Sequence, residues 1–159
     1  MKINVIGFYK IKKINKLKKH QNLLKKFFSK RFVKGIVILT PEGINGTIAG
    51  KKKNITECID YIKKKFYIKK FDSKSFSKVE YQPFNKTKIK IKKEVIPIGL
   101  KLTTLEKEKH KYIEPKNWNK LIKNKDVIVI DVRKTMEFKL GTFKYAIDPG
   151  IKNFRQFPS

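Results

Sequence analysis

Residues 35–50 read GIVILTPEGINGTIAG, and this segment predicts the centre of a β-sheet. Gly35–Thr40 is a short, continuous apolar run bounded by Gly and Pro, which is typical of a strand buried on both faces. Residues 41–46 carry turn chemistry, in which Asn45-Gly46 is the strongest short hairpin signal. We therefore expect the chain to reverse there and to return as a short strand over Gly46–Gly50.

The segments on either side of this hairpin predict further elements. Ahead of it, Ile3–Tyr9 predicts a strand of β-branched and aromatic residues. A basic amphipathic helix is expected over residues 15–31, with leucines and phenylalanines on one face. After the hairpin we expect a second helix over residues 54–66, capped by Asn54 or Thr56.

Two more strands are expected over residues 75–84 and 87–96. The complete order is then strand, helix, strand, strand, helix, strand, with one added strand. This order is the α+β, ferredoxin-like plan, in which both helices cover one face of an antiparallel sheet. We expect this domain to occupy residues 1–98.

The remainder of the chain predicts a linker and a second, smaller unit. Residues 99–111 are charged and lack clean periodicity, so we expect a linker there. Pro115 marks a helix start, and Asp126–Asp131 predicts a strand with the apolar core typical of parallel α/β sheets. Residues 112–159 therefore predict an α/β unit that ends before its sheet is complete. No metal-ligand cluster is visible in the sequence, so no metal site is expected.

Composition excludes some classes of protein. No apolar run approaches the ~20 residues of a membrane span, and we expect neither a span nor a signal peptide. The single cysteine, Cys58, excludes an internal disulfide and fits the cytoplasm. The formal net charge of +28 favours a polyanionic partner such as RNA. Most of the 41 basic residues are lysines, however, and AT-rich codon drift is an alternative source of them.

Residues 86–92 read KTKIKIK and alternate strictly. In a strand, Ile89 and Ile91 point to one face and the lysines point to the other. These lysines, the lysine ladder, are Lys86, Lys88, Lys90 and Lys92. Ammonium groups spaced ~6–7 Å apart suit contact with a phosphate backbone. The alternative is a solvated sheet edge, where lysines oppose aggregation.

Two further features have both a structural and a functional interpretation. The loop over residues 42–46 is either a tight hairpin with positive φ at Asn45 and Gly46, or a nest of backbone N–H groups that binds an anion. Cys58 is expected on the buried side of the second helix. A buried thiol without a nearby cation is usually inert, so we do not expect catalysis by Cys58.

Asp131-Val132-Arg133 directly follows the apolar strand of the second unit. Active sites of parallel α/β sheets lie beyond the carboxyl ends of strands, so Asp131 and Arg133 are placed to organise an anion-binding loop. The alternative is local pairing, in which Asp131 accepts backbone N–H groups and Arg133 pairs with Glu137. In either case these residues support a site and do not perform its chemistry.

The motifs in both parts of the chain resemble one family. The second unit resembles the first half of a rhodanese domain through DVR at 131–133, EF at 137–138, GTF at 141–143 and AIDP at 146–149. Residues 153–158, NFRQFP, resemble the Phe-Arg-x-Phe-Pro stretch of the rhodanese-related tRNA uridine hydroxylases, the family called TrhO. Residues 42–50, EGINGTIAG, and 90–96, KIKKEVI, are also similar to that family.

This resemblance implies an acylphosphatase-like, and so ferredoxin-like, N-terminal domain followed by part of an α/β rhodanese domain. It also implies an oxidoreductase that uses molecular oxygen as co-substrate to hydroxylate the wobble uridine of tRNA at carbon 5. Asp131, Arg133, Glu137 and Arg155 are then expected to form the active-site scaffold. The catalytic cysteine of the family is expected beyond Ser159, so we expect this chain to be inactive by itself and to hold no cofactor.

Two other functions stay open at the level of the sequence. The first is a non-catalytic RNA-binding module, in which the N-terminal domain alone does the work. The second is a fragment of a sulfurtransferase. The expected partner of the hydroxylase is tRNA, and the sequence carries no signal for the oligomeric state.

Overall fold

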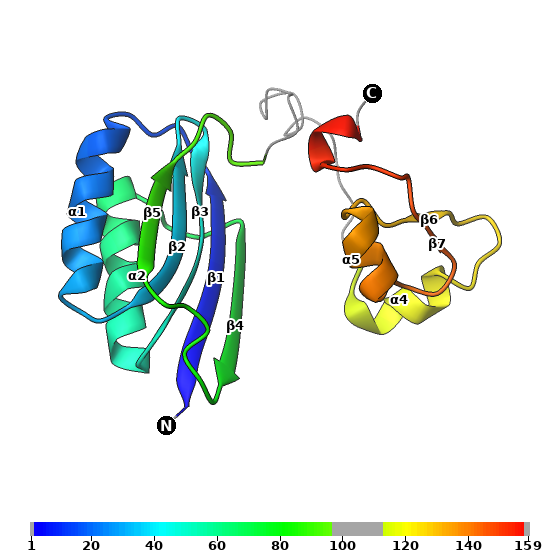
Figure 1. Cartoon of the computed structure of the whole chain (residues 1–159), viewed down its shortest axis with the longest axis horizontal. Coiled ribbons are helices and arrows are strands. Elements are labelled where there is room, and N and C mark those ends of the chain that lie inside the picture. The colour runs from blue at the N-terminus through cyan, green and yellow to red at the C-terminus, as the bar shows by residue number, and fades with distance from the viewer. Residues whose placement is uncertain (1, 97–112, 158–159) are drawn as a thin grey trace. The chain divides into compact units, whose positions relative to one another are not determined.

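The computed structural model describes residues 2–96 and 113–157 (Figure 1). The chain divides into two units, Met1–Val95 and Ile96–Ser159. The expected linker over residues 99–111 lies outside the described residues, as do the expected boundaries that flank it.

The first unit is a five-stranded sheet with two helices on one face (Figure 1). Its elements are β1 (Ile3–Ile11), α1 (Leu17–Ser29), β2 (Lys34–Thr40), β3 (Gly43–Gly50), α2 (Lys52–Phe66), β4 (Ser73–Val79) and β5 (Thr87–Ile91). The spatial order of the strands is β4-β1-β3-β2-β5. This arrangement confirms the predicted ferredoxin-like plan.

The added strand, β5, departs from the wholly antiparallel sheet that we expected. β5 pairs with β2 in parallel, whereas the other neighbours are antiparallel. The reason is the connection over residues 80–86, which joins β4 at one edge of the sheet to β5 at the other edge (Figure 1). The connection crosses near one end of the sheet, so β5 runs opposite to β4 and therefore along β2.

The core of the first unit lies between the sheet and the two helices. Its largest fully buried side chains include Leu24 and Phe28 of α1, Leu39 of β2, Ile44 and Ile48 of β3, and Ile55 and Ile62 of α2. Burial of each such side chain contributes about 1.5–3 kcal/mol relative to leaving it in water. A buried polar contact adds a link, because Gln21 Nε2 on α1 donates to the Ile89 carbonyl on β5 at 2.6 Å.

The hairpin between β2 and β3 turns earlier than predicted. Thr40 pairs with Gly43, so Pro41 and Glu42 form the turn and Asn45-Gly46 lies inside β3. The Thr40 hydroxyl closes the turn by accepting hydrogen bonds from the N–H groups of Glu42 and Gly43. The predicted hairpin at Asn45-Gly46 is therefore wrong, and the alternative anion nest is wrong as well, because β3 is paired on both sides.

Gly46 has a packing role in place of the expected turn. A Cβ at this position would lie 2.8 Å from Phe8 Cζ and 2.9 Å from the Ile36 carbonyl oxygen. Gly46 therefore lets the neighbouring strands and the Phe8 ring approach β3 closely.

Several predicted boundaries also shift. The second helix begins at Lys52 and has no side-chain cap, so the predicted caps Asn54 and Thr56 are wrong. The Asn54 side chain instead donates to the Arg31 carbonyl at 2.8 Å, which links the start of α2 to the end of α1. β4 ends at Val79, earlier than predicted, because residues 80–86 cross the sheet, and β5 begins at Thr87 as predicted but ends at Ile91.

The second unit is described over residues 113–157 and contains short elements. These are α4 (Pro115–Leu121), β6 (Val129–Ile130), α5 (Thr135–Leu140), β7 (Ala146–Ile147) and the 3-10 helix η1 (Phe154–Gln156). β6 and β7 form a two-stranded parallel sheet, as expected for an α/β unit. The rhodanese assignment of this unit stays a prediction.

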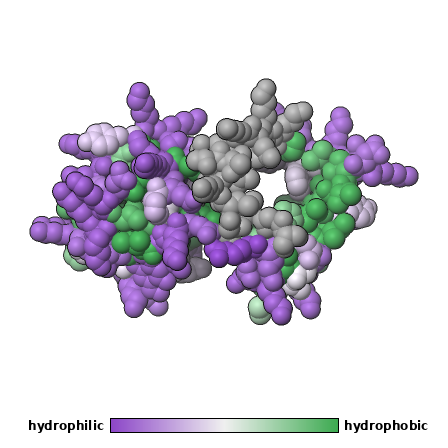
Figure 2. Space-filling view, turned by 90° about the horizontal axis from the view of Figure 1, so that it is seen from above, coloured by the Kyte–Doolittle hydropathy of each residue, from purple (hydrophilic) through white to green (hydrophobic). Residues whose placement is uncertain are grey.

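Within residues 113–157 few apolar side chains are buried. Val129 and Ile151 are buried, whereas Ile128, Met136 and Leu140 are among the exposed large hydrophobic side chains. In the view of Figure 2 this unit shows a hydrophobic (green) patch beside hydrophilic residues, and the first unit is mostly hydrophilic (purple). The described part of the second unit therefore has much less of a core than the first unit.

Candidate functional site

The lysine ladder lies on the sheet face that the helices leave open. Ile89, which pairs with buried Val37, is 3% exposed and faces the helices, so the alternating lysines face the other way. Lys86, Lys88, Lys90 and Lys92 are all exposed. This orientation confirms the predicted alternation of β5. Ile91, the last residue of β5, is 38% exposed.

A pocket of about 350 Å³ adjoins this ladder. It is lined by Gly35, Ile36, Pro83, Phe84, Asn85, Lys86 and Lys88. Ile36 and Lys88 are direct neighbours on β2 and β5, and the connection over residues 80–86 supplies the remaining lining residues beside Gly35. The volume falls in the range of small-molecule sites.

The sequence patterns did not identify Phe84 as a candidate site residue. It belongs to a short polar connection between two strands, and only the crossing of that connection over the sheet brings it to β2. The connection is fixed by two hydrogen bonds: the Phe84 N–H donates to Gln82 Oε1 at 3.3 Å, and the Gly35 N–H donates to the Lys86 carbonyl at 3.2 Å. The juxtaposition of an aromatic ring and two lysines is a property of the fold.

Cys58 is fully buried on the sheet side of α2, as predicted. Burial raises the pKa of the Cys58 thiol to about 12, even though the positive charge of Arg31 acts in the opposite direction. A thiol with this pKa carries almost no thiolate at neutral pH, and the thiolate is the reactive form. The structure therefore agrees with an inert packing role for Cys58.

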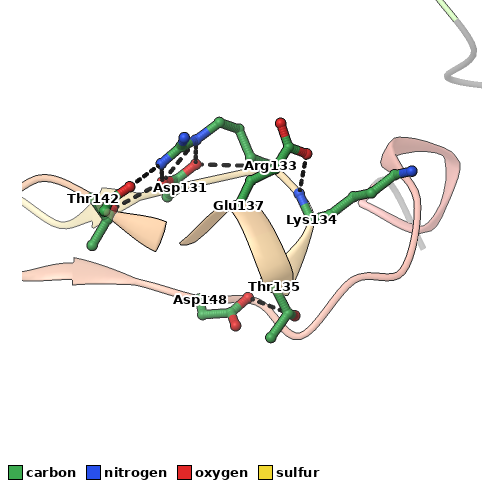
Figure 3. Close-up of polar contacts among 8 residues, drawn as sticks. Asp131, Arg133, Lys134, Thr135, Glu137, Thr142 and Asp148 are labelled. Carbon is green, nitrogen blue, oxygen red and sulfur yellow. Dashed lines mark hydrogen bonds and ion pairs between the residues drawn. The ribbon is translucent and has the colours of Figure 1, made fainter. Parts of the chain in front are cut away.

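The second unit brings Asp131 and Arg133 together as a bidentate pair (Figure 3). Arg133 Nη2 donates to Asp131 Oδ2 at 2.6 Å, and Arg133 Nε donates to Asp131 Oδ1 at 2.9 Å. Thr142 Oγ1 donates to Asp131 Oδ2 at 2.8 Å, and Arg133 Nη2 also donates to the Gly141 carbonyl at 2.6 Å. We call Asp131, Arg133, Gly141 and Thr142 the Asp131 network.

This network joins two loops at the carboxyl end of β6. The Asp131 side chain is 8% exposed, and its backbone N–H donates to the Ile147 carbonyl on β7. The Arg133 guanidinium, followed by the Thr142 hydroxyl and the Arg133 N–H, holds the pKa of Asp131 well below its usual range. Asp131 is therefore ionised throughout the neutral and mildly acidic range.

Glu137 and Arg155 lie outside this network. The predicted pair between Arg133 and Glu137 is wrong, because α5 begins at Thr135 and Arg133 precedes the helix. The Glu137 carboxylate instead accepts a hydrogen bond from the Lys134 N–H at the start of α5 (Figure 3). Arg155 lies in η1, where its N–H donates to Asn153 Oδ1 at 3.2 Å.

We expect replacement of Asp131 with Asn (D131N) to loosen the loop that precedes β7. The amide has no charge and only one acceptor oxygen, so it cannot hold the Arg133 fork and the Thr142 hydroxyl together. Hydrogen exchange at pH 7 should become faster in a peptide covering residues 141–147. Because the Asp131 pKa is lowered in the folded state, this stabilisation is present above the ordinary carboxyl pKa of ~3.9 and is lost only as the pH falls through the lower, folded value.

The matched control for this prediction is D126N. Asp126 is exposed and lies five positions earlier in the same unit, and the same change of charge there should leave exchange in residues 141–147 unaltered. Equal exchange in D131N and the unaltered chain would show that the network does not order this loop.

The described residues, 2–96 and 113–157, contain neither a membrane-spanning helix nor a metal-ligand cluster. No helix among them has both the length and the apolar character needed to cross a membrane. Nor do they contain a cluster of three or more His, Cys, Asp or Glu side chains arranged to hold a metal ion.

Comparison with known proteins provides a family match and a match to a curated protein. Residues 3–95 match the family described as the UPF0176 acylphosphatase-like domain. The chain is 48% identical over 155 residues to a protein of Pelagibacter ubique (strain HTCC1062) named tRNA uridine(34) hydroxylase. The match covers 98% of this chain and 51% of that protein, so the chain spans about half the length of this curated relative.

Two solved acylphosphatase structures show distant similarity. An acylphosphatase from Bacillus subtilis is 11% identical with a TM-score of 0.36, and the match covers 57% of this chain and 96% of that chain. An acylphosphatase from Coxiella burnetii is 9% identical with a TM-score of 0.35, and the match covers 57% of this chain and 90% of that chain. These similarities add nothing to the assignment.

Proposed function

We propose that this chain, which belongs to the family of the UPF0176 acylphosphatase-like domain, acts in the hydroxylation of uridine 34 of tRNA. The observation that carries the proposal is the identity of 48% over 155 residues to the Pelagibacter ubique protein named tRNA uridine(34) hydroxylase. The identity extends across both units, which supports a common reaction more strongly than a shared first domain does. We further propose molecular oxygen as co-substrate, tRNA as partner and the cytoplasm as location.

The two units have different roles in this proposal. The first unit contacts the tRNA, since its lysines supply a positive field that attracts and retains a phosphate backbone. In the second unit, the Asp131 network orders two loops at the carboxyl end of β6, which is where parallel α/β sheets place their active sites. Asp131 and Arg133 are positioning residues, because they act through the loops that they join.

The experiment is the removal of the gene from the cell that the chain comes from. Mass spectrometry of the tRNA should then show loss of 5-hydroxyuridine at position 34 and recovery of the modification when the gene is returned. Unchanged 5-hydroxyuridine in the deleted strain, with no second gene of this family in that strain, would contradict the proposal.

A Cys58→Ala variant of that gene should keep the modification. The Cys58 thiol is fully buried with a pKa of about 12, so it is unavailable as a nucleophile. We expect only a loss of about 1 kcal/mol in stability from the smaller side chain. The measurement is the 5-hydroxyuridine content of tRNA from cells that carry the variant, together with its thermal midpoint. Lost modification in a protein that is still folded would assign Cys58 a catalytic role.

A further inference from the structure

The pocket beside β5 combines three features that together match a nucleotide. Its lining includes the aromatic residue Phe84, the apolar residue Ile36 and the basic residues Lys86 and Lys88. The Asn85 side chain adds one hydrogen-bond donor group and one acceptor group. None of the residues that line the pocket is acidic.

We propose that this pocket receives one nucleotide of single-stranded RNA. The base lies against the Phe84 ring, and its flanking phosphates contact Lys86 and Lys88. The inference rests on the proposed function, because tRNA provides the strand, and it names the surface of the first unit that the tRNA contacts.

The base is recognised by stacking. Aromatic side chains hold the bases of single-stranded nucleic acids through their faces, and they do so for any base. Phe84 is half-buried, so part of the residue stays accessible to a ligand. Ile36 is half-buried as well, and it supplies apolar contact on the open face of the sheet.

The lysine ladder defines the path of the RNA strand over the protein. Lys90 and Lys92 continue on the same face as Lys88, at the ~6–7 Å intervals of alternate residues in a strand. Successive phosphates of an extended RNA strand have a comparable spacing, so the backbone runs along β5 as its charges pair with the ladder. An edge strand suits this role, since no further strand among residues 2–96 and 113–157 covers its outer side.

The first test measures how much the lysines at the pocket contribute to RNA binding. The full chain is titrated into a fluorescein-labelled oligouridylate at several salt concentrations, and fluorescence anisotropy reports binding. In a Lys86→Gln, Lys88→Gln variant we expect binding about tenfold weaker. The slope of log K against log salt should fall by about 1.4, because each phosphate contact to a single strand contributes about 0.7.

A matched variant on the helix side controls for net charge. Lys25 and Lys26 are exposed residues of α1, which covers the opposite face of the sheet. Lys25→Gln, Lys26→Gln removes the same charge and should leave the salt slope unchanged. Equal effects of the two variants would overturn the proposal in favour of a general positive field, and a larger effect on α1 would place the RNA on the helices.

The second test measures stacking. Phe84→Ala should weaken oligouridylate binding about tenfold and leave the binding of inorganic polyphosphate unchanged, because polyphosphate has charge but no bases. Equal loss for both polymers, or no loss for either, would overturn the pocket assignment.

A tryptophan variant keeps the second test valid if Phe84→Ala fails to fold. The chain has one tryptophan, Trp118, so a Phe84→Trp, Trp118→Phe variant carries its only indole in the pocket. Oligouridylate should quench its fluorescence, and polyphosphate should not. Fluorescence that does not respond to RNA at saturation would contradict stacking at this position.

The binding tests and the gene deletion fail independently. Normal 5-hydroxyuridine after deletion, with binding that depends on Phe84, would refute the hydroxylase and retain the RNA pocket. Lost 5-hydroxyuridine, with binding insensitive to Phe84 and Lys86, would retain the hydroxylase and move the RNA contact elsewhere.

Discussion

Replacement of Gly35 with alanine is expected to destabilise the first unit by about 3–5 kcal/mol. Gly35 has a φ of +139°, a region that L-residues with a side chain rarely adopt. A Cβ there would also lie 2.2 Å from the Thr47 carbonyl oxygen and 2.7 Å from Ile48 Cα on the central strand β3. Backbone atoms of a strand that is paired on both sides have no room to move, so strain and overlap both oppose folding.

A urea titration followed by far-ultraviolet circular dichroism measures this loss. With an m-value of about 2 kcal/mol/M, the midpoint of the first unit should fall by about 2 M. Gly50→Ala is the matched control, because a Cβ at Gly50 meets Val33 Cγ2 at 3.4 Å, an ordinary contact, and the backbone there is unstrained. Similar midpoints for the two variants would show that the close approach of β2 and β3 at Gly35 is not needed for stability.

The order of the elements in the first unit could be predicted because each buried face leaves a period in the sequence. The apolar run of β2 and the stripes of α1 and α2 follow from which side chains pack in the core. The hairpin could not be placed, because the local signal of Asn45-Gly46 competes with the pairing of β3 on both sides. Tertiary packing outweighs the local turn preference of Asn45-Gly46, because a turn at that position would remove Ile44 from the core.

For the candidate sites too, local sequence patterns predict only part of the arrangement. Asp131 and Arg133 are two positions apart, so their pairing could be anticipated from the sequence. Their partners lie on another loop. Gly141 comes eight positions after Arg133, which it contacts, and Thr142 comes eleven positions after Asp131. The pocket at Phe84 depends on a connection that crosses the whole sheet, and no local pattern encodes that crossing.

We expect Phe28→Ala to cost about 3–5 kcal/mol, whereas Phe32→Ala should change the stability by less than about 0.5 kcal/mol. The two phenylalanines are four positions apart and differ in burial: Phe28 is 0% exposed in the core of the first unit, and Phe32 is 84% exposed. Removal of the Phe28 ring leaves a cavity between α1 and the sheet, which the rigid strands cannot fill.

The Phe28→Ala variant also tests which interaction stabilises the fold of a chain with net charge +28. Mutual repulsion of the lysines opposes the compact state and is screened by salt, whereas burial of Phe28 is not. An increase in salt should therefore raise the urea midpoint of Phe28→Ala and that of the unaltered chain by the same amount. The difference between the two midpoints should stay constant. A difference that vanishes in high salt would mean that Phe28 acts through the charged surface, and the packed layer of α1 on the sheet would then not be the main source of stability.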